Sequence, residues 1–100
     1  MKVRFTPSAR EHFLDAVTYL RSQNPLAAAR FRTRASKILR RLAPHPGSGR
    51  KIPEFPQVPH REVIVAPCRF FYRLEGNVVW IVAVWHGAQL PDDPAGVRNK

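Results

Sequence analysis

The 100-residue sequence has a single cysteine, Cys68, and no apolar run long enough for a signal peptide or a membrane span. One thiol cannot form an internal disulfide or a cysteine-based metal cluster, so we expect a protein of the reducing cytoplasm. These absences argue against an exported disulfide scaffold and an integral membrane protein. They predict a cytoplasmic location and no membrane partner.

Acidic residues are also scarce. They number 7 against 17 lysines and arginines, which gives a formal net charge of +10 at pH 7, and none occurs between Asp15 and Glu54. Clustered positive charge attracts polyanions, so RNA, DNA or an acidic protein is an expected partner. Thirteen of the 17 cations are arginine, which suits planar contacts to phosphate. A merely solvated basic surface is the alternative.

Metal-ligand spacing is likewise missing, because the histidines and Cys68 do not fall at the intervals of known metal sites. We therefore expect no metal and no cofactor. The histidines are His12, His45, His60 and His86. Arg69, which follows Cys68, could lower the pKa of that thiol.

What the sequence does have is the composition of a globular protein, with 44% apolar and 24% charged residues. A chain of this length forms about one domain with a thin core. We expect a single domain over residues 1–90 and a polar, frayed tail over residues 91–100.

The first half of the sequence predicts a strand followed by two helices. Apolar and basic residues alternate over residues 2–5, which is typical of a strand. Thr6-Pro7 and Asn24-Pro25 are helix-start signals, and apolar residues recur after each at helical spacing. The helices should run over about 7–21 and 25–42 and form an antiparallel hairpin, because few residues separate them.

The second half predicts an antiparallel sheet, because the apolar period changes to two from His60 onward. Strands are expected over residues 60–66, 69–75 and 78–85, and the last is apolar on both faces and should be an interior strand. The fold class is therefore α+β, in the order β-α-α-β-β-β, with the helical hairpin packed on a small, mainly antiparallel sheet.

Cations on the second helix recur at spacings of four, three and four, which places them on one face. We assign this face to partner binding, with a solvated helix surface or a nucleic-acid surface as alternatives. The residues are Arg30, Arg34, Lys37 and Arg41.

Seven short motifs, taken in order, cover most of the chain and together resemble the RelE/ParE superfamily of toxins from type II toxin–antitoxin systems. They are Phe5-Thr6-Pro7-Ser8-Ala9, Asn24-Pro25-Leu26-Ala27-Ala28, Pro46-Gly47-Ser48-Gly49-Arg50, Pro53-Glu54, Arg61-Glu62-Val63-Ile64-Val65, Arg69-Phe70-Phe71-Tyr72-Arg73 and His86-Gly87-Ala88. The resemblance implies a concave site on the sheet face away from the helices. It also implies a cognate antitoxin that wraps and blocks the toxin.

The superfamily has two kinds of target. RelE-like members cut messenger RNA on the ribosome, whereas ParE-like members poison DNA gyrase, and a shared fold does not choose between them. A ribosome-dependent, metal-free endoribonuclease is the first hypothesis, and a gyrase inhibitor without enzymatic activity is the alternative. A degenerate, non-toxic binding partner is a third possibility.

Metal-free RNA cleavage needs a base, a phosphate clamp and an acid around one phosphate. The resemblance implies Arg69 as the clamp and His86 as the acid, and Glu54 is the candidate base. Glu62 competes with Glu54, but its neighbour Arg61 makes a structural ion pair the favoured interpretation. Tyr72 points away from Arg69 and is expected in the core.

Four further cations complete the expected substrate-binding set. They stand near the proposed catalytic residues in sequence, and Arg61 with Arg69 would suit a two-arginine phosphate pocket. RelE itself has strand lysines where this chain has His60 and Glu62, which is a departure from the ribonuclease pattern. The substrate-binding candidates are Arg50, Lys51, Arg61 and Arg73.

Overall fold

The computed structural model describes residues 1–87, and the expected tail over residues 91–100 lies outside them. The α+β fold is confirmed, and it has one short strand, β2, in addition to the predicted order of elements. The elements are β1 (Lys2–Phe5), α1 (Pro7–Gln23), α2 (Pro25–Arg41), β2 (Arg50–Lys51), β3 (Arg61–Val65), β4 (Cys68–Glu75) and β5 (Val78–His86).

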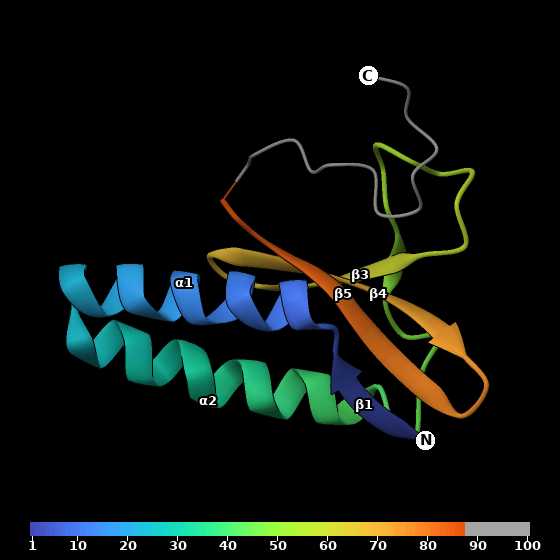
Figure 1. Ribbon diagram of the computed structural model, residues 1–100, viewed down its shortest axis with the longest axis horizontal. Coiled ribbons are helices and arrows are strands. Elements are labelled where there is room, and N and C mark those ends of the chain that lie inside the picture. Colours follow the sequence, from blue (N-terminus) through green and yellow to red (C-terminus); the bar gives the residue numbers. More distant parts are fainter. Residues whose placement is uncertain (88–100) are drawn as a thin grey trace.

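Both helices begin at the expected signals. The Thr6 hydroxyl accepts a hydrogen bond from the Ala9 N–H at 3.2 Å, and the Asn24 side chain accepts one from the Ala27 N–H at 3.1 Å. Each side chain satisfies an amide that the first helical turn leaves free. Only Asn24 separates α1 from α2, so the helices form the expected antiparallel hairpin (Figure 1). Neither described helix is long and apolar enough to cross a membrane.

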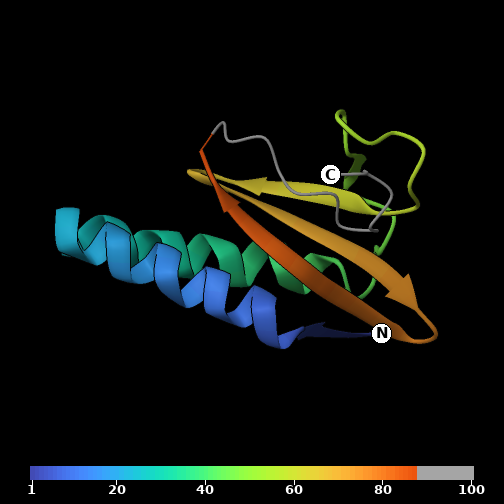
Figure 2. The same cartoon turned by 45° about the horizontal axis from the view of Figure 1, so that its top comes forward.

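The sheet has the strand order β1-β5-β4-β3-β2, and only the β1–β5 pair is parallel. The expected interior position of β5 is therefore confirmed. The helical hairpin covers one face of the sheet, and the segment between β2 and β3 rises on the other side (Figure 2). The fold thus has a helix-covered face and a loop-covered face.

Each face of the sheet has its own core. On the helix side, aromatic residues from both helices meet β4, with the Phe31 and Phe70 rings 6.2 Å apart between centroids. On the other side, a smaller cluster holds the proline-rich segment against Phe71 of β4. Burial of these apolar groups positions that segment over the sheet. The smaller cluster is Ile52, Phe55, Val58 and Phe71.

Candidate functional site

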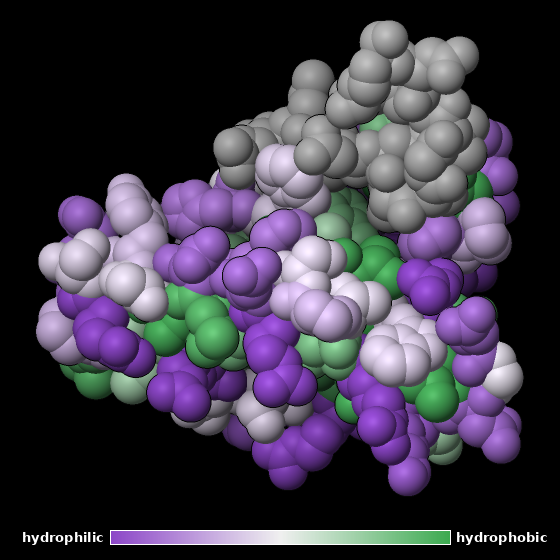
Figure 3. Space-filling model, viewed as in Figure 1, coloured by the Kyte–Doolittle hydropathy of each residue, from purple (hydrophilic) through white to green (hydrophobic). Residues whose placement is uncertain are grey.

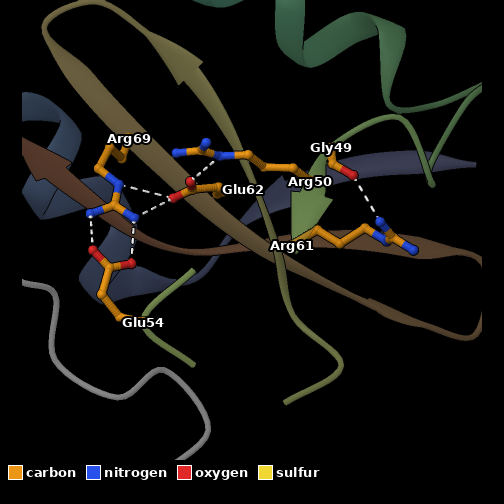
Figure 4. A network of polar contacts seen from close by, with 6 residues as sticks. All are labelled: Gly49, Arg50, Glu54, Arg61, Glu62 and Arg69. Atoms are coloured by element: carbon orange, nitrogen blue, oxygen red, sulfur yellow. Dashed lines mark hydrogen bonds and ion pairs between the residues drawn. The ribbon is translucent and has the colours of Figure 1, made fainter. Parts of the chain in front are cut away.

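Four charged side chains gather on the loop-covered face of the sheet (Figure 4). Glu62 comes from β3, Arg69 from β4, Arg50 from β2 and Glu54 from the proline-rich segment. The Glu62 side chain is 0% exposed and that of Arg69 only 11%. A buried carboxylate is tolerated only when it is paired, so this network decides what the face can do.

The four side chains of this network pair with one another. Arg69 Nη2 and Nη1 donate to the two oxygens of Glu54 at 2.8 and 3.0 Å, and Arg69 Nε donates to Glu62 at 2.9 Å. Arg50 Nε donates to the other Glu62 oxygen. The Arg69 guanidinium also lies over the Phe71 ring, 5.2 Å from its centroid. Two cations and two anions therefore neutralise one another, and Arg69 ties the segment that carries Glu54 to the sheet.

The pKa values of the pair follow from this contact. The hydrogen bonds from Arg69 hold the pKa of Glu54 below its ordinary value of 4.5. Those from Glu54 in turn raise the pKa of Arg69. A carboxylate that is ionised, doubly hydrogen-bonded to arginine and low in pKa is a weak base. In this arrangement Glu54 is an anchor for Arg69.

Arg61 lies apart from this network. Arg61 precedes Glu62 on β3, and neighbouring residues of a strand point to opposite faces. The Arg61 Nη1 donates instead to the Gly49 carbonyl at 2.9 Å (Figure 4). The expected ion pair of Glu62 with Arg61 was therefore wrong in its partner, since Glu62 pairs with Arg50 and Arg69 instead. The two-arginine pocket of Arg61 and Arg69 does not form.

His86 is also separated from Arg69. The register pairs Arg69 with Trp85, so the next residue, His86, points to the helix-covered face. Its ring packs edge-on against Tyr19 of α1, with centroids 5.4 Å apart. The structure brings Arg69 and Glu54 together and places His86 elsewhere.

A cavity of about 380 Å³ lies beside His86, between α1 and the end of β5. His12, which no sequence pattern had marked as functional, lines it and accepts a hydrogen bond from the Val84 N–H at 3.3 Å. Asp15 and Tyr19 follow His12 at helical spacing, and this spacing was the available signal. Among the described residues, no group of three potential metal ligands forms here or elsewhere.

The remaining substrate-binding candidates are scattered. Arg50 belongs to the network with Glu62, whereas Lys51 is exposed next to it on β2. Arg73 lies four residues along β4 from Arg69, about 13 Å away, and pairs with Glu75 at 3.4 Å. Arg50 is thus the one member of this set, within residues 1–87, that shares a carboxylate with Arg69, namely that of Glu62.

Two neighbours of the network are structural. Tyr72 is buried as expected, and its hydroxyl accepts from the Gly49 N–H at 2.9 Å while donating to the Pro46 carbonyl at 2.7 Å. The expected lowering of the Cys68 pKa was wrong. Burial raises the pKa of that thiol to about 11, because an apolar environment disfavours the thiolate.

The cations assigned to partner binding are exposed on α2, which a partner surface and a merely solvated helix face predict equally. Hydrophilic side chains cover much of the helical hairpin on the face in Figure 3, with small apolar patches between them. The cations assigned to partner binding are Arg30, Arg34, Lys37 and Arg41.

Comparison with known proteins shows the family of the chain and a similar solved structure. The family model of the ParE toxin of the type II toxin–antitoxin system parDE matches residues 3–91. A chain of the chromosomal ParDE toxin–antitoxin system from P. aeruginosa has a TM-score of 0.70 and 17% sequence identity, over 87% of this chain and 96% of that chain. At this identity the likeness concerns the fold alone. No curated protein matches the sequence.

Proposed function

Because this chain belongs to the ParE family of toxins of type II toxin–antitoxin systems, we propose that it arrests growth by binding DNA gyrase. ParE-like members of the superfamily poison gyrase, and the family model spans residues 3–91. The proposal treats the chain as a toxin without enzymatic activity. An antitoxin protein holds it inactive until that antitoxin is removed.

The observation that carries the proposal is the separation of Arg69 from His86. A metal-free ribonuclease must place its clamp and its acid around one phosphate. Here the Arg69 donors are taken by Glu54 and Glu62, and His86 points to the other face of the sheet. This arrangement supports a binding toxin over a nuclease.

Releasing Arg69 for phosphate would also be costly. Glu62 is fully buried, and without Arg69 it would keep only the largely exposed Arg50 as its partner. Breaking a buried ion pair typically costs about 3–5 kcal/mol. A phosphate would have to supply that free energy before it gained any catalytic contact. The network therefore serves the fold.

Induced expression in a bacterium without the antitoxin tests the proposal, with DNA damage and protein synthesis followed in parallel. We expect growth to stop, the DNA-damage response to rise first and messenger RNA to stay intact. His86→Ala should be as toxic as the wild type, and the exposed His45→Ala is its matched control.

Two outcomes would refute the proposal. Cleaved messenger RNA and arrested translation, both lost in His86→Ala but not in His45→Ala, would establish the ribonuclease. Normal growth at full expression would instead identify a non-toxic binding partner.

A further inference from the structure

The edge of the sheet next to α2 is only partly covered. Strand β2 pairs with β3 at Arg61 and Glu62 alone, so the stretch from Val63 to Val65 has β4 on one side. On its other side, no strand among residues 1–87 pairs with it. Such an edge presents backbone N–H and C=O groups to an incoming strand.

Backbone groups of alternate residues point to the same edge of a strand. Glu62 faces β2, and the Ala66 carbonyl accepts a hydrogen bond from Arg34 of α2. Ile64 lies between these two residues and therefore presents its own N–H and C=O to the open edge. The Arg34 contact indicates that donors from outside the sheet reach this edge.

Helix α2 runs alongside this edge. Arg34 reaches Ala66 at one end, and Arg41 borders a hollow of about 370 Å³ with Glu62 and Ile64 at the other. The seven-residue step from Arg34 to Arg41 covers about 10 Å of helix. The four-residue step from Glu62 to Ala66 covers about 13 Å of extended chain, so the two lengths are similar. The cations and the open edge thus form one feature, the α2–β3 groove, bounded by Arg34, Ile38, Arg41 and Ile64.

The charge of the α2–β3 groove is not neutralised within the described chain. Within residues 1–87 the ion pairs of Glu54, Glu62 and Glu75 use Arg50, Arg69 or Arg73, and none of them uses a cation of α2. A partner that approaches this helix therefore gains from negative charge. The exposed cations of α2 are Arg30, Arg32, Arg34, Lys37, Arg40 and Arg41.

The two faces beside the edge differ in chemistry. Val63 belongs to the helix-side core, so Ile64 points to the loop-covered face, where it is 48% exposed. A strand added to β3 would turn alternate side chains toward α2 and the others toward Ile64. Acidic side chains suit the first position and apolar side chains suit the second.

We propose that the α2–β3 groove binds an extended segment of a partner protein in which acidic and apolar residues alternate, and that this segment adds as a strand to β3. Nucleic acid would use the cations but leave the backbone edge and Ile64 unused. Taking the partner to be the antitoxin rests on the proposed function. The chemistry of the groove stands on its own contacts.

A fluorescein-labelled peptide of four Glu-Val repeats tests the proposal on the full-length toxin by fluorescence anisotropy. We expect binding that weakens at least about tenfold in the double variant Arg34→Glu/Arg41→Glu. The matched control is Arg32→Glu/Arg40→Glu, which changes the net charge equally. Its residues lie on other sides of α2, with Arg40 bonded to Ser36, and its affinity should change less than about threefold.

Two measurements on the wild-type protein cover the case in which a charge-reversed variant does not fold. The same peptide with all backbone amides N-methylated keeps its charge but cannot donate to a strand, and we expect at least about tenfold weaker binding. Hydrogen exchange of the Ile64 amide should slow when the unmodified peptide is added.

Several results would overturn the proposal. These are equal weakening in the two double variants, full affinity of the N-methylated peptide, unchanged exchange at Ile64, or absence of peptide binding. A toxin that inhibits gyrase without binding the peptide would refute the groove assignment alone. One that binds the peptide at the groove without affecting gyrase would refute only the proposed function.

Discussion

Arg69 donates hydrogen bonds from both terminal nitrogens to the Glu54 carboxylate, at 2.8 and 3.0 Å. It thereby joins the proline-rich segment to β4, the central strand of the sheet. Such two-pronged contacts hold both position and orientation. The residue that the family resemblance singles out as a phosphate clamp is thus occupied by the protein's own carboxylates. Its first role is to hold the fold together.

The buried carboxylate of Glu62 should be the most sensitive member of the network. Its side chain is 0% exposed and pairs with Arg50 and Arg69, so Glu62→Gln leaves both guanidinium groups with a weaker acceptor. We expect a loss of about 3 kcal/mol in the free energy of unfolding, measured by urea denaturation. Glu75→Gln, in the exposed pair with Arg73, should cost less than about 0.5 kcal/mol. Equal costs would show that Glu62 is not specially held.

Acid should weaken the protein through Glu54. Its folded-state pKa lies below the ordinary 4.5, so its contribution is complete above that value and is lost as the pH falls through the folded-state pKa. Glu54→Gln should therefore lower the melting temperature at about pH 7, and this deficit should shrink as the pH falls below 4.5. Thermal unfolding across this range, with the exposed Glu11→Gln as control, measures the difference. A deficit that is constant with pH would contradict the ion pair.

Gly49 is expected to tolerate no side chain. A Cβ atom there would lie 2.5 Å from the Tyr72 hydroxyl and 2.7 Å from the Glu62 carbonyl oxygen. Gly49→Ala should destabilise the protein by about 1–3 kcal/mol, the usual cost of overpacking. At Gly47 a Cβ meets nothing within 4 Å, so Gly47→Ala should be neutral or slightly stabilising. Chemical denaturation of the two variants decides the matter, and similar effects would refute the close packing at Gly49.

Cys68 should be unreactive in the folded protein. Burial raises its pKa from 9.0 to about 11, so the thiolate fraction at about pH 8 falls roughly 100-fold. Alkylation by iodoacetamide should be slower than in urea by at least about that factor, since burial also blocks access. Equal rates in the folded and unfolded protein would show an accessible thiol.

The local signals of the sequence predicted the helices well, because Thr6-Pro7 and Asn24-Pro25 act through neighbouring amides. Strand β2 could not be predicted in this way. It is two residues long and exists because the segment after it packs against Phe71 and brings Arg50 opposite Glu62. That packing is long-range and leaves no local pattern.

The candidate site was predicted less well for a similar reason. Whether His86 shares a face with Arg69 depends on the register of β4 and β5, and a shift of one residue would reverse the answer. The partner of Glu62 depends equally on which strand lies beside β3. The sequence shows which charged residues are present, but strand pairing decides which of them lie together on one face of the sheet.

Gyrase inhibition by the purified toxin tests the central claim most directly. Relaxed plasmid, gyrase and ATP are incubated with increasing toxin, and messenger RNA on programmed ribosomes is incubated in parallel. We expect supercoiling to fall as toxin is added while the messenger RNA stays uncut. Unchanged supercoiling at saturating toxin, together with cleaved messenger RNA, would contradict the account.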